Sequence, residues 1–351
     1  MPASDTRENA MSTTSSSFSP LTRRGFLKTA ALAGAALLCP APARLWAAVP
    51  EAAFTETRLL MGTIVSISVA SPSQDKAQDA LGRAFARMAA LEAIFTRHDS
   101  GAPLATLNAR GALHDAPPEL CALMLRAQRV GQLTSGCFDV TVTPVLELFR
   151  AHQNPAGRMR LDAADMAAAL QLVDAASLHV GARDLSFQRQ GMAATLDGIA
   201  KGHIVDCASQ TLLDCGVTAH LINAGGDIRA SGEKAPGRPW TVGVEHPARR
   251  GAVVQTLPLA GAIATSGSYE VYFDADRHYH HLINPASGVS PTRVNSVSVL
   301  APTTVEADAL ATALAVMIPQ DALRLARSLP GVECCILGAD GLKMVSAGWP
   351  A

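Results

Sequence analysis

The sequence lacks a surplus of charge of either sign, and it lacks an apolar run long enough to cross a membrane. Its 351 residues contain 29 Lys and Arg against 30 Asp and Glu, a formal net charge of −1. This balance gives no electrostatic basis for binding nucleic acid. The apolar run at residues 29–39 is much shorter than the roughly 20 residues that a transmembrane helix needs. We therefore expect no nucleic-acid partner, and a mature protein that does not span a membrane.

Signatures of several common cofactor sites are missing as well. The seven cysteines show no CxxC or Cys/His spacing typical of a zinc site or a redox pair. No GxGxxG opens a predicted helix, so a Rossmann dinucleotide site is not indicated. The histidines within residues 278–281 lack the HExxH spacing of a helical zinc site. Free, buried thiols are the expectation for the six cysteines beyond residue 48, whose pairing the sequence leaves open.

The first 48 residues form a separate region with the features of an export signal. A polar start rich in Ser and Thr leads to Arg23 and Arg24, which precede the apolar run and then a stretch of small residues. This order is typical of a cleavable signal peptide, and the paired arginines resemble a twin-arginine signal. We expect residues 1–48 to be a disordered start and such a signal, and the mature domain, residues 49–351, to be periplasmic.

Helix and strand patterns alternate irregularly along the mature chain. Apolar residues recur at helical spacing over residues 74–95, 117–136, 161–173, 198–216, 305–314 and 320–328. Strand patterns cover residues 58–70, 179–196, 217–228, 240–245, 262–273 and 294–300, followed by a terminal hairpin. Residues 96–104 and 150–160 are expected to be loops. Because there is neither an internal repeat nor a strict βαβ rhythm, the pattern predicts an α+β domain with mixed or antiparallel sheets and flanking helices.

An otherwise apolar helix near the C-terminus places Asp308 and Thr312 four residues apart. Residues with this spacing share one helix face, so the carboxylate and the hydroxyl are predicted to converge on one point. Two hard oxygens suit Mg²⁺, which usually takes one or two carboxylates and completes its shell with water and phosphate. The alternative is structural: Asp308 caps a helix or forms a salt bridge, and Thr312 bonds to the carbonyl of residue 308.

Two further stretches carry polar groups suited to catalysis. Lys201 stands between glycines at the start of a predicted helix, where it can neutralise a phosphate, although a solvated lysine is an alternative. Among the histidines at 278–281, any one can accept a proton near neutral pH or be a structural imidazole. Asp227, after two glycines, is interpreted as part of a strand with a glycine bend.

Seven ordered motifs together resemble the ApbE-type FAD:protein FMN transferases, also called flavin transferases. In chain order they are MGT, GCFDVT, DGIAKGHIVD, NAGGD, IATSGSYE, HLINPASG and ADALATAL. The resemblance covers nearly all of the mature chain. It implies a single α+β unit of two lobes, with the substrate FAD held in the cleft between them.

The resemblance also implies a role for individual residues. Mg²⁺ would be held by Asp308, Thr312 and the backbone carbonyl of Gly198, with Asp308 thereby serving catalysis. The residues expected to contact FAD are Met61, Cys137, Phe138, Asp139, Lys201 and Leu282.

Three positions depart from the family pattern. Thr195 stands where members commonly carry Asp, and Asp197 is expected to supply a carboxylate from a shifted position. His98 stands where an aromatic residue often faces the isoalloxazine, and imidazole offers less area for stacking. Ala102 replaces a usual Ser.

The predicted reaction is phosphoryl transfer. A Ser or Thr hydroxyl of an acceptor protein attacks the FMN-side phosphorus of FAD, AMP leaves, and His281 accepts the hydroxyl proton. By resemblance, the acceptor is a flavoprotein domain of a membrane electron-transfer complex. Two alternatives use the same pocket: a Mg²⁺-dependent FAD pyrophosphatase with water as nucleophile, and a non-catalytic periplasmic FAD-binding protein.

Overall fold

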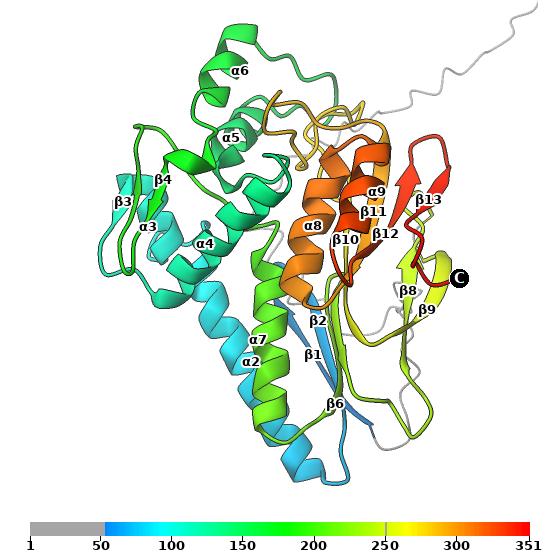
Figure 1. Cartoon of the computed structure of the whole chain (residues 1–351). Helices are drawn as coiled ribbons and strands as arrows, with labels where there is room; N and C mark the ends of the chain where they lie inside the picture. The colour runs from blue at the N-terminus through cyan, green and yellow to red at the C-terminus, as the bar shows by residue number, and fades with distance from the viewer. Residues whose placement is uncertain (1–52, 250) are drawn as a thin grey trace, which may run out of the picture. The chain divides into compact units, whose positions relative to one another are not determined.

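An eight-stranded antiparallel sheet forms the centre of the fold (Figure 1). The computed structural model describes residues 53–249 and 251–351, so the predicted export signal lies outside the described residues. The strand order is β1-β2-β6-β7-β10-β11-β12-β13. These strands are β1 (Ala53–Leu60), β2 (Thr63–Ala70), β6 (Ala219–Ala224), β7 (Asp227–Ser231), β10 (Gly261–Gly267), β11 (Val294–Ala301), β12 (Glu333–Gly338) and β13 (Lys343–Val345).

Two small antiparallel sheets and a set of helices complete the domain. The small sheets are β3 (Ala112–Leu113), β5 (Leu185–Phe187) and β4 (Leu178–Val180), and β8 (Trp240–Glu245) with β9 (Val253–Leu259). The α-helices are α2 (Gln74–Phe95), α3 (Pro103–Arg110), α4 (Pro118–Leu133), α5 (Thr143–Ala151), α6 (Ala163–Leu170), α7 (Ala200–Asp214), α8 (Thr304–Val316) and α9 (Pro319–Ser328). Short 3₁₀ turns lie at η1 (Val140–Val142) and η2 (Ala175–Ser177). The α+β class predicted from the sequence is confirmed.

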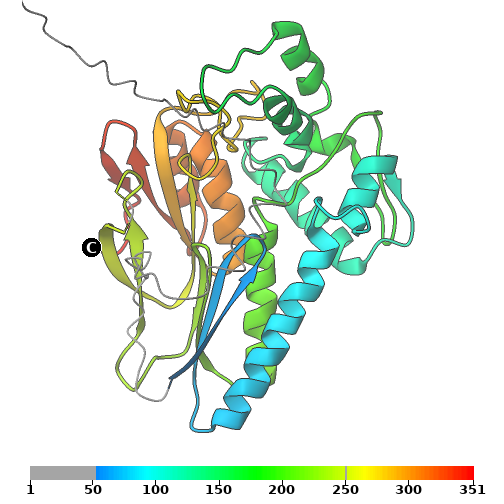
Figure 2. The same ribbon diagram turned by 180° about the vertical axis from the view of Figure 1, so that it is seen from behind.

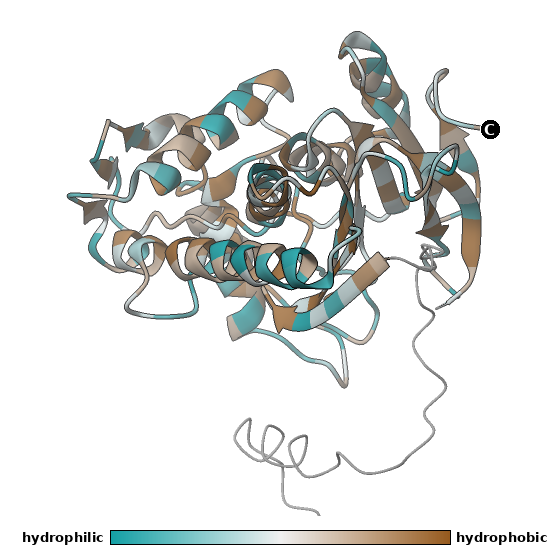
Figure 3. Cartoon of the chain, turned by 90° about the horizontal axis from the view of Figure 1, so that it is seen from below, coloured by the Kyte–Doolittle hydropathy of each residue, from teal (hydrophilic) through white to brown (hydrophobic). Residues whose placement is uncertain are grey.

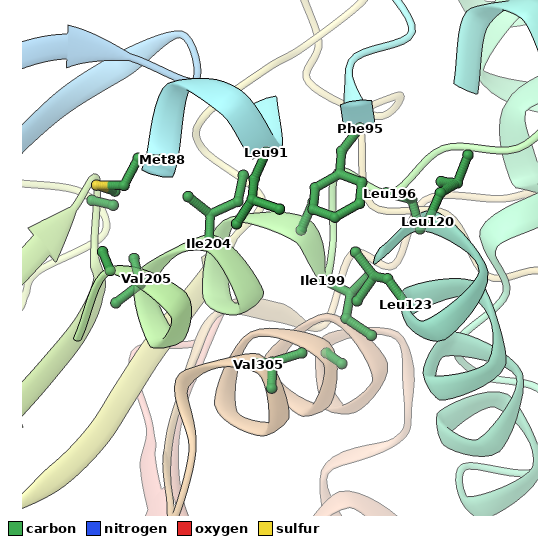
Figure 4. Close-up of a cluster of buried hydrophobic side chains, with 14 of the residues drawn as sticks. Met88, Leu91, Phe95, Leu120, Leu123, Leu196, Ile199, Ile204, Val205 and Val305 are labelled. Atoms are coloured by element: carbon green, nitrogen blue, oxygen red, sulfur yellow. The ribbon is translucent and has the colours of Figure 1, made fainter. Parts of the chain in front are cut away.

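Helix α2 forms where the sequence predicts it. The Ser73 side chain caps its first turn by accepting a hydrogen bond from the Lys76 backbone N–H. Its buried residues recur every three or four positions, while the others are mostly polar. Figure 3 shows this mixture as teal (hydrophilic) and brown (hydrophobic) segments along the helices. The buried side packs on α7, which lies beside it in Figures 1 and 2. Met88, Leu91 and Phe95 meet Ile204 and Val205 there (Figure 4).

Helix α8 is buried on nearly all sides. Eleven of its 13 residues are buried, as expected for a helix that is apolar all round. It packs on α7 on one side and on strands β10 and β11 on the other. Five of the eleven buried residues are alanines, whose small side chains let the helix and strands approach closely. The buried Asp308 side chain is therefore enclosed between α8 and its neighbours.

The segment between β10 and β11, residues 268–293, has no regular structure and is anchored to α5. The Phe149 ring of α5 makes edge contacts with Phe273 at 5.6 Å and with Tyr279 at 5.1 Å. The Asp274 carboxylate accepts hydrogen bonds from the backbone N–H groups of residues 278 and 279 at 3.0 and 3.2 Å. Figure 1 shows these gold loops next to α5. The histidines predicted to do chemistry lie on this segment.

Several predicted boundaries were wrong. The strand predicted over residues 58–70 is a hairpin, because Met61 and Gly62 turn the chain with φ of 53° and 69°. The predicted loops at 96–104 and 150–160 hold the start of α3 and the end of α5, and β9 was not predicted. The strand predicted over 262–273 ends at Gly267.

Two further observations concern cysteines and membranes. All six cysteines of the described part of the chain are free thiols, three of them buried. Among the helices of residues 53–249 and 251–351, none is long and apolar enough to span a bilayer.

Candidate functional site

The crossing of α7 and α8 fixes the position of Asp308. A Cβ atom added to Gly202 of α7 would overlap the carbonyl oxygen of Thr304 and lie 2.8 Å from Asp308 Cβ, so this position requires glycine. The Gly202 backbone N–H donates a hydrogen bond of 2.9 Å to Asp308 Oδ2. One turn further along α7, the Asp206 carboxylate accepts from the first N–H groups of α8 at 2.9 Å. The buried carboxylate of Asp308 is thus held by two helices.

Thr312 and Gly198 meet one helical turn away from Asp308. A Cβ atom added to Gly198 would lie 3.0 Å from Thr312 Oγ1 and 3.3 Å from the Phe138 ring. The Thr312 hydroxyl makes a hydrogen bond of 3.3 Å with Ser266 of β10, instead of bonding to the carbonyl of residue 308. The structural alternative for Thr312 is therefore not the one adopted. The three residues that the resemblance predicts to hold Mg²⁺ come from two separate segments, α8 and the turn before α7, and they lie together.

The donor set of this cluster suits Mg²⁺. It comprises one carboxylate, one hydroxyl and the backbone next to Gly198, all of them hard oxygen donors. In the described part of the chain, no three His, Cys, Asp or Glu side chains gather into a metal site. The set therefore fits an ion that takes few protein ligands and completes its shell with water and phosphate, which is how Mg²⁺ is usually bound.

Lys201 is paired with Asp227, a residue that the sequence analysis took for a simple strand position. Its Nζ lies 2.6 Å from Asp227 Oδ2, and the Asp227 side chain is only 2% exposed. Burial alone would lower the pKa of Lys201, but the carboxylates of Asp227 and Asp308 outweigh this effect and raise it. Lys201 therefore stays charged, and it remains 31% exposed. The ion pair orients the ammonium beside the Asp308 cluster.

The site carries more negative than positive charge. Burial, and then the nearby Asp227 carboxylate, raise the pKa of Asp308 to about 8, although Lys201 and the Gly202 N–H oppose the shift. Glu270, an exposed residue just beyond β10, also acts electrostatically on Lys201. Three carboxylates thus act on the charge of one ammonium. A divalent cation would offset the excess and favour the ionised form of Asp308.

His281 is neutral and lies near the charged cluster. Its Nδ1 is buried without a hydrogen-bond partner among the described residues, and its backbone N–H donates to the Val271 carbonyl at 3.2 Å. Burial, and then neighbouring His280, lower the pKa of His281 to about 4. The charge of Lys201 lowers this pKa further, and that of Asp197 opposes the shift. A neutral imidazole at pH 7 is able to accept a proton.

Met61 and His98, both predicted to contact the flavin, flank one surface depression. The Met61 backbone N–H donates to Glu92 Oε1 at 2.9 Å, and Glu92 lines the depression. The depression has a volume of about 370 Å³ and is lined by Ala89, Glu92, Ala93, Thr96, His98 and Asp99. His98 itself is exposed. Whether these residues contact FAD stays a prediction.

The predicted turn at residues 137–139 is mainly a structural feature here. Phe138 is buried and packs next to Gly198, while Cys137 is partly buried against the α8 cluster. The two carboxylate oxygens of Asp139 accept hydrogen bonds from the backbone N–H groups of Thr141 and Ala175 at 2.7 and 3.0 Å. Asp139 therefore caps η1, and any role in FAD binding stays a prediction.

The remaining predicted FAD contacts are Thr195, Asp197 and Leu282. Thr195 is buried, and its Oγ1 accepts from the Asp197 N–H at 3.1 Å. The Asp197 carboxylate is 61% exposed and pairs with Arg97 at 3.1 Å. Leu282 is buried in the apolar cluster that includes α8. The shifted carboxylate predicted at Asp197 is thus present, but it has a protein partner.

Comparison with known proteins identifies the family. A model of the ApbE family matches residues 61–336. The chain belongs to the ApbE family. The FAD:protein FMN transferase of Treponema pallidum is 30% identical over 321 residues, which cover 84% of this chain and 87% of that protein. The corresponding protein of Salmonella typhimurium is 28% identical over 319 residues, covering 86% and 89%.

A solved structure agrees with this assignment. The crystal structure of the ApbE protein from Thermotoga maritima has a TM-score of 0.76, with 28% identity, and covers 84% of this chain and 97% of that one. The predicted resemblance and the predicted transferase class of this ApbE family member are confirmed.

Three residues of the cluster were missed by the sequence analysis. Asp227, Ser266 and Glu270 all lie in motifs that were recognised, NAGGD and IATSGSYE. The motifs give no sign of which of their polar residues face α7 and α8, because that depends on the pairing of distant strands.

Proposed function

We propose that the chain transfers FMN from FAD to a Ser or Thr hydroxyl of an acceptor protein, in a Mg²⁺-dependent reaction that releases AMP. The observation that carries this proposal is the convergence of Asp308, Thr312 and Gly198 beside the Lys201–Asp227 pair. A buried site with hard oxygen donors and an ammonium suits a diphosphate with its metal ion. The name of the relatives, FAD:protein FMN transferase, and the seven ordered motifs of this chain support the same reaction.

The chain's own residues would contribute mainly by positioning and by neutralising charge. Asp308, Thr312 and the Gly198 carbonyl would hold Mg²⁺, which when bound supplies positive charge beside the FAD diphosphate. Lys201 would face the diphosphate while Asp227 keeps its ammonium oriented. The depression beside Met61 and His98 would take part of the flavin.

His281 would accept the proton of the acceptor hydroxyl. As the hydroxyl oxygen bonds to the FMN-side phosphorus, the bond from that phosphorus to the bridging oxygen breaks, and AMP leaves with the bridging oxygen. With a pKa of about 4, the imidazole is unprotonated at neutral pH. Because Nδ1 of His281 is buried, an incoming hydroxyl cannot reach it. The other ring nitrogen, Nε2, is therefore the one that would accept the hydroxyl proton.

The location and the acceptor are also part of the proposal. The paired arginines and the following apolar run support export to the periplasm through a twin-arginine signal. The acceptor would then be an exported flavoprotein domain of a membrane electron-transfer complex.

A His281→Ala variant tests the proposed reaction. The purified full chain is incubated with FAD, MgCl₂ and an acceptor domain, and the acceptor is examined by mass spectrometry for an added FMN phosphate. We expect the variant to bind FAD as the unmodified chain does but to attach almost no FMN. His278→Ala serves as the matched control, because His278 is an exposed histidine of the same segment.

Two outcomes would contradict the proposal. If His281→Ala loses FAD binding but the remaining bound fraction transfers FMN normally, His281 is not the base. If the unmodified chain releases free FMN and AMP equally fast with and without acceptor, it is a pyrophosphatase that uses water.

A further inference from the structure

Strand β10 brings the hydroxyl of Ser266 to the proposed metal cluster, a residue to which the motifs assign no role. Successive side chains of a strand point to opposite faces. Ala262 and Ala264 pack in the cluster that contains α8, so Ser266 lies on the same face as these two residues. Thr265 lies on the other face, where its hydroxyl bonds to Ser298 of β11 at 2.7 Å. Ser266 is thus the one polar residue in the row Ala262, Ala264, Ser266.

Ser266 is in hydrogen-bond contact with one of the proposed metal-holding residues. Its Oγ lies 3.3 Å from Thr312 Oγ1, and Gly198 lies against that same threonine hydroxyl. A hydroxyl has one proton and two lone pairs. If the threonine oxygen is to offer a lone pair to a cation, its proton must point elsewhere, and Ser266 Oγ is the acceptor within reach.

We propose that Ser266 is a positioning residue of the Mg²⁺ site, which accepts the Thr312 hydroxyl proton and thereby turns a lone pair of Thr312 Oγ1 toward the ion. This inference rests on the proposed function, because it assumes that Asp308, Thr312 and Gly198 hold Mg²⁺. Groups that orient metal ligands in this way typically change metal affinity by about 10- to 100-fold when they are removed. A purely steric role, as a small residue that lets α8 approach, predicts no such change in a Ser266→Ala variant.

The test measures Mg²⁺ binding directly, without the reaction. The full chain is titrated with MgCl₂ by calorimetry, and the rise in melting temperature with MgCl₂ concentration gives a second estimate of affinity. We expect Ser266→Ala to weaken Mg²⁺ binding by about 10-fold while the metal-free melting temperature stays close to that of the unmodified chain. Thr265→Val is the matched control: it removes the neighbouring hydroxyl from the other face of β10, and Mg²⁺ affinity should not change.

A double-mutant cycle separates orientation of Thr312 from any other effect. Because Ser266 acts through Thr312, Ser266→Ala should cause no further loss of Mg²⁺ affinity in a Thr312→Val background. With acceptor present, Ser266→Ala should raise the MgCl₂ concentration needed for half-maximal transfer and leave the rate at saturating MgCl₂ nearly unchanged.

The outcomes distinguish this inference from the proposed function. If Asp308→Asn abolishes Mg²⁺ binding but Ser266→Ala does not weaken it, or weakens it equally in the Thr312→Val background, the role of Ser266 is wrong and the metal site stands. If Asp308→Asn also leaves Mg²⁺ binding unchanged, the metal site is wrong, and both the inference and the proposed mechanism fail.

Discussion

The close approach of α7 and α8 makes a sharp prediction about one glycine. In a Gly202→Ala variant, the new Cβ would overlap the Thr304 carbonyl oxygen and lie 2.8 Å from Asp308 Cβ. Neither obstacle is the end of a flexible side chain, so one helix must move. The best control is Gly82, which lies inside α2 and has no atom within 4 Å of an added Cβ.

The two substitutions should change the free energy of unfolding in opposite directions. Replacing Gly by Ala inside a helix stabilises it by up to about 1 kcal/mol, so Gly82→Ala should gain roughly 0.5–1 kcal/mol. Gly202→Ala has the same propensity gain, but forcing an extra carbon into a packed contact costs about 1–3 kcal/mol or more. Because the obstacles belong to a buried helix, we expect the upper end of that cost, about 3 kcal/mol, and after the propensity gain a net loss of about 2–2.5 kcal/mol.

Urea unfolding followed by circular dichroism measures both changes, provided that the slope against urea concentration stays the same. Gly202→Ala should also lower Mg²⁺ affinity, since pushing α8 away from α7 moves Asp308 and Thr312 away from Gly198. The reasoning is refuted if Gly202→Ala is as stable as the unmodified chain or more stable. If Gly82→Ala is destabilised to the same extent, the loss at Gly202 cannot be assigned to the helix crossing.

Two further predictions concern pH. Burial and the nearby Asp227 raise the pKa of Asp308 to about 8, so below this pH Mg²⁺ must displace a proton from the Asp308 carboxylate. The Mg²⁺ affinity measured by calorimetry should therefore fall about tenfold for each pH unit below 8. An affinity that does not change with pH would contradict this prediction. Burial lowers the pKa of His220 to about 4 from an ordinary 6.5, so the folded chain resists its protonation. Neutral His220 therefore contributes to the free energy of unfolding above about pH 6.5. As pH falls toward 4, this stabilisation is lost, by an amount on the order of 3 kcal/mol. A His220→Gln variant should show a shallower fall of the urea midpoint over this range, and an unchanged fall would exclude His220 as the cause.

Local pattern predicted the helices well and the strands less well. Residues 74–95 were predicted as a helix with the observed bounds, because capping and apolar spacing are both local signals. The hairpin of β1 and β2 was missed because Met61 adopts a positive φ, which is uncommon for a residue other than glycine and is not signalled by its side chain. Helices α3 and α5 were not predicted, and the loops predicted at 96–104 and 150–160 overlap the start of α3 and the end of α5.

In the candidate site, too, local features were predicted and long-range contacts were not. The spacing of Asp308 and Thr312 on one helix was enough to predict that they share a face. That Asp227 pairs with Lys201 and that Ser266 reaches Thr312 depends on which strands become neighbours, here β7 with β10 and β10 with β11. Such long-range pairings follow from the whole tertiary structure, so no local pattern could have revealed them.

The anchoring of residues 268–293 to α5 separates two parts of the proposed chemistry. Asp308, Thr312 and Ser266 belong to a packed unit of helix α8 and strand β10. His281 instead lies in the long irregular segment 268–293, whose aromatic residues pack against Phe149 of α5. Substitutions around α5 are therefore expected to move His281, the proposed base, without moving Asp308, Thr312 or Ser266. Mutation could thus separate a loss of the proposed proton acceptor from a loss of the proposed metal site.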